Sequence, residues 1–126
     1  MSSERTYHVR QYDESSLLID LCRGRESTEM RMVIRGDLDA VSADRLCASV
    51  SDVLRRQRPT RITLDLRGVT FLDSAGIRAL LRCRDEADAA RISFILAETP
   101  ATIVRVLEIT GLAAHFGVAG CPEPGA

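Results

Sequence analysis

The residues with the clearest chemical potential lie in the stretch TFLDSAGIRAL, residues 70–80. Ser74 stands there between an apolar pair, Phe71 and Leu72, and the start of a helical pattern. A serine hydroxyl at such a turn could cap the helix, attack a substrate as a nucleophile, or accept a phosphate group. Each role requires different neighbours, so the residues around Ser74 distinguish between the three roles.

A catalytic role for Ser74 has little support from its neighbours. A serine nucleophile needs a base, and the elbow of α/β-hydrolases reads G-x-S-x-G at a strand-to-helix turn. In LDSAG the first glycine of that pattern is replaced by Leu72. The two histidines of the chain are His8 and His115, and the spacing of neither relates it to Ser74. We therefore expect no enzyme, and a serine hydrolase ranks last among the functions considered.

Helix capping explains part of the motif. Asp73 or Ser74, just before an apolar-periodic helix, is the residue type that an N-cap requires. Capping does not explain Gly76, which stands inside the first helical turn, where glycine costs about 1 kcal/mol relative to alanine. We therefore expect another backbone, or a partner, to approach closely at Gly76.

Phosphate acceptance also suits this position. A helix N-terminus offers N–H groups and positive potential, so a serine in the first turn could carry a phosphate without disturbing the fold. The phosphate would add about −1.5 to −2 charges beside Asp73. A binding surface around Ser74 would then be switched by bulk and charge alone.

A second acidic site lies in RGDLDA, residues 35–40, between a strand pattern and a helix pattern. Asp37 and Asp39 could simply close an Asx-type turn. Because the ends of parallel strands meet at one edge of a sheet, either acid could instead approach Ser74. It would then serve as a partner contact or as an acid suited to magnesium. No GxxxxGK[ST] or GxGxxG loop is present, so the sequence has no nucleotide-hydrolysis machinery of its own.

Hydrophobic periodicity predicts the elements that position these residues. We expect Ser42 to cap the first helix and Thr99 to cap the third, with Pro100 as its first helical residue. The near-continuous apolar run 91–98 is typical of a strand at the centre of a sheet. Alternating strands and helices imply parallel strands with crossovers. The expected strands are 16–23, 30–36, 61–68 and 91–98, and the first two helices are 43–57 and 74–89.

Composition limits the classes of function. The chain has 126 residues, 45% of them hydrophobic, which suits one domain with a real core. Its net charge is −1, from 17 basic and 18 acidic residues, which argues against broad electrostatic binding to nucleic acid or membranes. The polar N-terminus lacks a secretion signal, so we expect a cytoplasmic, reducing setting.

The cysteines fit that setting. Cys22, Cys47, Cys83 and Cys121 lie far apart, without the spacing of a zinc site. The first three fall within apolar patterns, where cysteine usually acts as a small core residue. We therefore predict no metal site.

Three stretches together resemble the STAS domain, named for sulfate transporters and anti-sigma factor antagonists. They are MVIRGDLDAVSADRL, ITLDLRGVTFLDSAGIRALL and PATIVRVLEITGLAAHFGV. The resemblance covers residues 16–118, preceded by a polar segment, residues 1–15, and followed by a flexible tail, residues 119–126. It implies a single α/β domain with a four- to five-stranded mixed sheet flanked by helices and the D-S-x-G serine at a helix start.

The resemblance also implies a function, that of an anti-sigma factor antagonist in a bacterial partner-switching pathway that regulates transcription under stress. The unphosphorylated protein would bind a partner that is both serine kinase and anti-sigma factor, and so release the sigma factor. Phosphorylation at Ser74 would end this binding, and a phosphatase would restore it. ATP and magnesium would be bound by the kinase, so this chain itself would need no cofactor.

The family pattern assigns the partner-binding residues Asp39, Asp73, Ser74, Ala75 and Gly76. Many relatives carry serine or threonine where this chain has Ala75, which leaves Ser74 as the single acceptor within the motif. The same resemblance leaves an alternative open. The chain could be a structural or ligand-binding subunit of a transport or signalling assembly, since fold alone does not determine function.

Overall fold

The computed structural model describes residues 6–9, 17–23, 28–114 and 116 of the chain. Strands and helices alternate after an antiparallel start, as the periodicity predicts. In chain order the elements are β1 (Thr6–Val9), β2 (Leu18–Arg23), β3 (Glu29–Leu38), α1 (Ala43–Arg56), β4 (Arg61–Leu72), α2 (Ser74–Ala89), β5 (Ser93–Ala97) and α3 (Ala101–Ile109).

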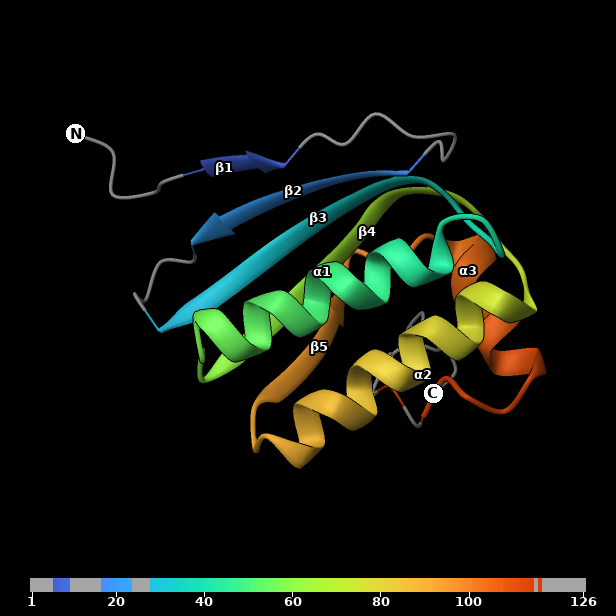
Figure 1. The fold of residues 1–126 in the computed structure, drawn as a ribbon. Helices are drawn as coiled ribbons and strands as arrows, with labels where there is room; N and C mark the ends of the chain where they lie inside the picture. The colour runs from blue at the N-terminus through green and yellow to red at the C-terminus, as the bar shows by residue number, and fades with distance from the viewer. Residues whose placement is uncertain (1–5, 10–16, 24–27, 115, 117–126) are drawn as a thin grey trace.

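The strands form one mixed sheet in the order β1-β2-β3-β4-β5. The first two pairings are antiparallel, whereas β3 with β4 and β4 with β5 are parallel. Figure 1 shows α1 and α2 side by side across one face of the sheet, with α3 at its right-hand end. This arrangement confirms the predicted α/β domain with a four- to five-stranded mixed sheet flanked by helices.

The core lies between the sheet and the two long helices. Alternate residues of the central strands are almost completely buried, because a strand points successive side chains to opposite faces. These residues are Met30, Met32, Ile34, Ile62, Leu64 and Leu66. The helices contribute a matching stripe that includes Leu46, Val50 and Leu80. None of the helices within the described ranges is both long and apolar enough to cross a membrane.

Two strands differ from the sequence-based prediction. β1 falls within the N-terminal segment that was expected only to be polar, and it pairs with β2. The apolar strand β5 lies at the edge of the sheet, so the prediction of a central position is wrong. Within β5, Leu96 is buried and Phe94 packs against Phe116, with ring centroids 6.5 Å apart, whereas Ile95 is 38% exposed. The run contains no information about how many neighbouring strands pair with it.

Two helix starts also differ in detail. Ser42 occupies the N-cap position of α1, but its hydroxyl makes no capping bond and instead donates to the Asp37 carbonyl oxygen at 2.8 Å. Pro100, not Thr99, occupies the N-cap position of α3, without a side-chain capping bond, and the first helical residue is Ala101. Proline fixes φ but leaves ψ available, and Pro100 adopts an extended ψ of 150°, which places it just outside the helix.

A buried carboxylate, that of Asp65, stabilises the face of the sheet opposite to the core residues Leu64 and Leu66. The Asp65 side chain is only 5% exposed, and its Oδ2 lies 2.7 Å from Nη2 of Arg31 on the neighbouring strand. Its Oδ1 accepts a hydrogen bond of 2.9 Å from the backbone N–H of Arg67. Both oxygens therefore have partners, as a buried charge requires.

We expect Asp65→Asn to lower the free energy of unfolding by about 1–3 kcal/mol, because it removes the charge that pairs with Arg31. Arg31 is 37% exposed, so solvent relieves part of the loss. Denaturant unfolding measures the effect. The matched control is Asp52→Asn, which breaks an exposed ion pair with Arg56 and should change stability by at most about 0.5 kcal/mol. Equal effects of the two substitutions would contradict the role assigned to Asp65.

Candidate functional site

The site lies where two parallel strands end together. Leu38 at the end of β3 pairs with Leu72 at the end of β4, and Asp37 pairs with Phe71. The β3–α1 loop and the β4–α2 turn therefore leave the sheet side by side, at the right of Figure 1. This confirms the expectation that the loops carrying the acidic residues and the serine share one edge.

Asp73, not Ser74, caps α2. Asp73 is extended, with φ −114° and ψ −171°, and its Oδ1 accepts a hydrogen bond of 3.0 Å from the backbone N–H of Gly76. Ser74 is the first residue of the helix and is exposed. The structure thus assigns capping to the carboxylate and leaves the serine hydroxyl on the surface, at the positive end of the helix dipole.

Gly76 makes the close backbone approach that its position predicts. It is buried, and a Cβ atom added to it would lie 2.3 Å from the carbonyl oxygen of Leu38. The same oxygen accepts a hydrogen bond of 3.3 Å from the backbone N–H of Asp73. The end of β3 therefore presses directly against the first turn of α2, and only glycine leaves room for it.

Asp37, near the end of β3, and Asp39, in the β3–α1 loop, both have structural roles. An Asp39 carboxylate oxygen accepts hydrogen bonds from the backbone N–H groups of Val41, at 3.0 Å, and Ser42, at 3.2 Å. Asp37 Oδ1 accepts a bond of 2.9 Å from the Thr70 hydroxyl on β4. The Asx-type turn is thus present, whereas a partner contact through Asp39 stays a prediction. Among the residues that the structure describes, no group of three or more His, Cys, Asp or Glu side chains could hold a metal ion.

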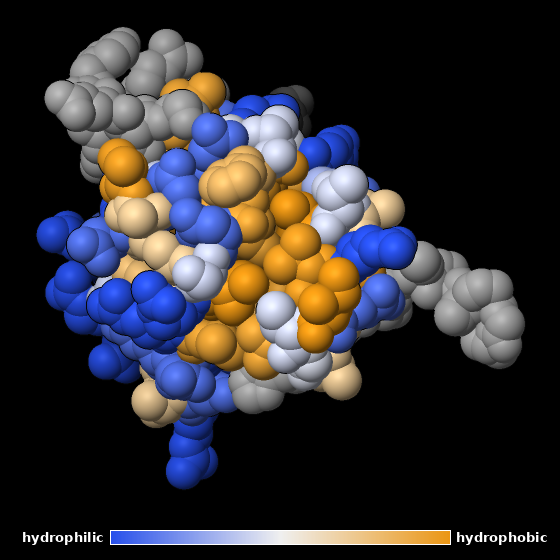
Figure 2. Space-filling model, turned by 90° about the vertical axis from the view of Figure 1, so that its right-hand side faces the viewer, coloured by the Kyte–Doolittle hydropathy of each residue, from blue (hydrophilic) through white to orange (hydrophobic). Residues whose placement is uncertain are grey.

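Two exposed apolar side chains lie near the edge of the sheet at which β3 and β4 end. Val41, in the β3–α1 loop, is 65% exposed, and Phe71, three residues before Ser74, is 48% exposed. Figure 2 shows hydrophobic residues gathered over the middle of the molecular side that carries these loops. The sequence shows Phe71 only as part of an apolar pair before Ser74 and contains no motif that includes Val41 as a contact residue. Hydrophobic periodicity assigns apolar residues to the core. The position of Val41 in a loop, outside any periodic pattern, is the one sequence signal that it is exposed.

The geometry does not provide Ser74 with a histidine base from the described residues. His8 lies on β1, three strands away from β4, which is roughly 14 Å at the usual strand spacing. Leu72, at the position of the first elbow glycine, is buried. His115, whose spacing does not relate it to Ser74, lies outside the described residues.

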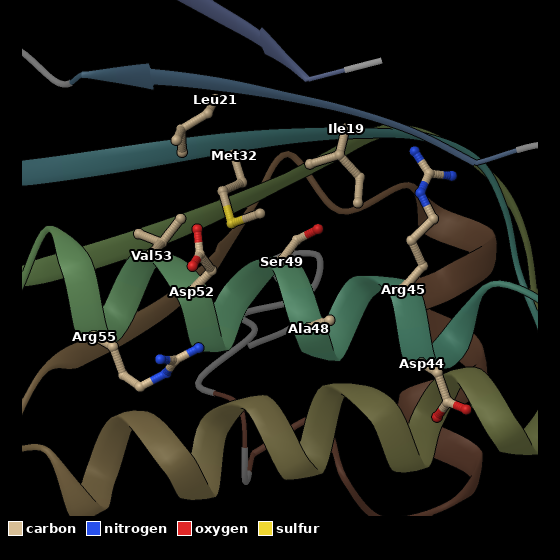
Figure 3. Close-up of a pocket in the computed structure, with 10 residues that line it drawn as sticks. All are labelled: Ile19, Leu21, Met32, Asp44, Arg45, Ala48, Ser49, Asp52, Val53 and Arg55. Carbon is tan, nitrogen blue, oxygen red and sulfur yellow. The ribbon is translucent and has the colours of Figure 1, made fainter. Parts of the chain in front are cut away.

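A separate groove of about 600 Å³ lies between α1 and the β2–β3 part of the sheet. Figure 3 shows Ile19, Leu21 and Met32 pointing from the strands toward the helix. Arg45 and Asp52 contribute charged groups from α1, and Arg45 donates a hydrogen bond to the Leu17 carbonyl oxygen. None of the groove residues belongs to the β4–α2 turn, so the groove and the serine site are distinct.

We expect Gly76→Ala to lower the free energy of unfolding by about 1–3 kcal/mol, because the added methyl group collides with the Leu38 carbonyl and forces α2 away from β3. The measurement is chemical denaturation. Ser74→Ala, two residues earlier on the exposed surface, is the control and should stay within about 0.5 kcal/mol of the parent. A fully stable Gly76→Ala protein would contradict the proposed close approach.

Comparison with solved structures identifies the fold. The unphosphorylated anti-sigma factor antagonist SpoIIAA superposes with a TM-score of 0.64 and 22% identity over 76% of this chain and 83% of that one. An anti-sigma factor antagonist from Mycobacterium paratuberculosis gives 0.71 and 20% over 91% and 93%. A sulfate transporter family protein from Wolinella succinogenes gives 0.64 and 20% over 77% and 82%.

These TM-scores show a shared fold, whereas sequence identities of 20–22% leave the function open. The sequence itself matches the family model described as "STAS domain" over residues 23–121, a range that contains β3, both site loops and all three helices. The chain therefore belongs to the STAS domain family.

Proposed function

We propose that this protein is an anti-sigma factor antagonist whose binding to an anti-sigma factor is switched off by phosphorylation of Ser74. The observation that carries the proposal is the exposed hydroxyl at the first residue of α2, in a turn already closed by Asp73 and Gly76. Exposed Val41 and Phe71 beside it supply the apolar contacts that a protein partner would cover.

The physical basis of the switch is local. The dipole of α2 favours a negative group at Ser74 by about 0.3–1 kcal/mol, so the folded domain tolerates the phosphate. The cap by Asp73 and the contact of Gly76 with Leu38 do not involve the serine hydroxyl, so they persist after modification. What changes is the surface, which gains bulk and about −1.5 to −2 charges next to apolar side chains.

The partners follow from this scheme. The anti-sigma factor is also the serine kinase and binds ATP and magnesium, while a phosphatase regenerates the unphosphorylated protein. This chain acts as a binding module in the bacterial cytoplasm and carries out no catalysis. Asp39, in the β3–α1 loop, and Ala75, in the first turn of α2, belong to the proposed contact surface because both lie at the edge of the sheet that carries Ser74.

One observation favours a second function, that of a ligand-binding or structural subunit of a transport or signalling assembly. The groove beside α1 has an apolar floor of Ile19, Leu21 and Met32 and charged groups at its rim. Pockets of about this size with such linings suit small ligands. This alternative does not require Ser74 to be modified.

The decisive test combines phosphate mapping with binding. After incubation with the anti-sigma factor kinase and ATP, mass spectrometry should find phosphate on Ser74 and none on a Ser74→Ala variant. Ser74→Ala should retain binding to the anti-sigma factor. Ser74→Glu should weaken binding about tenfold or more, because like-charge repulsion and desolvation would cost at least about 1.4 kcal/mol of binding free energy.

The matched control is Ser93→Glu, which adds the same charge to an exposed serine at the opposite end of the sheet. It should leave binding unchanged. Phosphate on another residue, or equal weakening by both glutamates, would refute the switch. Co-purification with a membrane transporter in place of a kinase would favour the alternative function.

A further inference from the structure

Two cysteines meet at the interface between α1 and α2. Cys47 on α1 is half-buried, and Cys83 on α2 is 1% exposed. The Cys47 thiol donates to the carbonyl oxygen of Ala79 at 3.6 Å, and Ala79 stands one helical turn before Cys83 on the buried side of α2. Cys47 thus lies against the segment of α2 that carries Cys83. Sequence spacing did not indicate this pair, because 36 residues separate them.

Polar contacts hold the two helices together on both sides of the pair. Arg82 Nη1 lies 3.8 Å from Asp44 Oδ1, one turn before Cys47. The Ser51 hydroxyl donates to Glu86 Oε2 at 2.7 Å, one turn after Cys47. Cys47 therefore lies between two points at which α1 meets the segment of α2 that contains Cys83.

The electrostatic environment makes the two thiols unequal. The pKa of Cys47 is lowered from 9.0 to about 7, chiefly by a hydrogen bond from Cys83. Burial raises this pKa, the positive charge of Arg82 lowers it, and the negative charges of Asp44 and Glu86 raise it. The hydrogen bond with Cys47 and burial raise the pKa of Cys83 well above its usual range. The lowered pKa favours the thiolate form of Cys47, which is the reactive form of cysteine, whereas the raised pKa favours the protonated form of Cys83.

We propose that Cys47 and Cys83 form a reversible redox site in which peroxide oxidation joins α1 to α2 through an intramolecular disulfide. Cys47 is the partly accessible attacking thiol, and Cys83 is the buried resolving thiol. This site is independent of phosphorylation, so it goes beyond the proposed function and does not rest on it.

The chemistry balances with hydrogen peroxide as the oxidant. The Cys47 thiolate attacks one peroxide oxygen, the O–O bond breaks, and the products are a Cys47 sulfenic acid and hydroxide. The Cys83 sulfur then attacks the Cys47 sulfur, the S–O bond breaks, and the hydroxyl group leaves as water with the Cys83 proton. The two thiols lose two electrons in total, and the peroxide gains them. Loss of the Cys47 negative charge in the first step removes one cause of the raised Cys83 pKa.

The test uses the full chain carrying Cys22→Ser and Cys121→Ser, so that only the proposed pair remains. One equivalent of hydrogen peroxide should lower the intact mass by two hydrogen atoms, and peptide mapping should find Cys47 linked to Cys83. A thiol reductant should restore the original mass. The disulfide should raise Tm by roughly 5–10 °C, because it constrains the unfolded chain.

Single substitutions assign the roles. Cys83→Ala should stop oxidation at a Cys47 sulfenic acid that a dione probe traps, and the pH midpoint of Cys47 alkylation should rise from about 7. Cys47→Ser should abolish both products. Ser74→Ala should leave oxidation unchanged, which separates this site from the phosphorylation switch. Intermolecular disulfides, sulfinic acid without a disulfide, or a Cys47 that reacts no faster than Cys22 in the parent protein would overturn the proposal.

Discussion

The contact between the Leu38 carbonyl oxygen and Gly76 is the constraint on which the site depends. Parallel pairing brings the ends of β3 and β4 together, and the missing side chain of Gly76 lets the first turn of α2 seat directly on the end of β3. The Leu38 oxygen also accepts from the N–H of Asp73, so the same atom positions both the cap and the glycine. The direction in which α2 leaves the sheet follows from this contact.

Once the turn is held in this way, the serine is not needed for structure. Asp73 satisfies the N–H of Gly76, and Asp39 closes its own loop through Val41 and Ser42. Asp37 accepts from the Thr70 hydroxyl, so each of these acidic side chains has a partner within the fold, whereas Ser74 is exposed. A surface modification at a rigid turn is a way to alter binding at small cost in stability.

Sequence patterns predicted the individual helices and strands better than they predicted the order of the strands in the sheet. The helix from Ser74 to Ala89 begins and ends as expected, because capping chemistry and amphipathic periodicity are local properties. β1 was missed because a four-residue strand depends on pairing with β2 more than on its own sequence. β5 was assigned to the centre of the sheet because an apolar pattern reflects burial of side chains, and strand order is decided by long-range pairing.

By itself, the sequence determined the α/β class, the motif around Ser74 and the need for a close approach at Gly76, since these depend on residues that are neighbours along the chain. Only the tertiary structure decided which group approaches Gly76, that Asp65 is buried against Arg31, and that Cys47 meets Cys83. These contacts join residues more than 30 positions apart. Their existence depends on strand order and on helix packing, which no local spacing encodes.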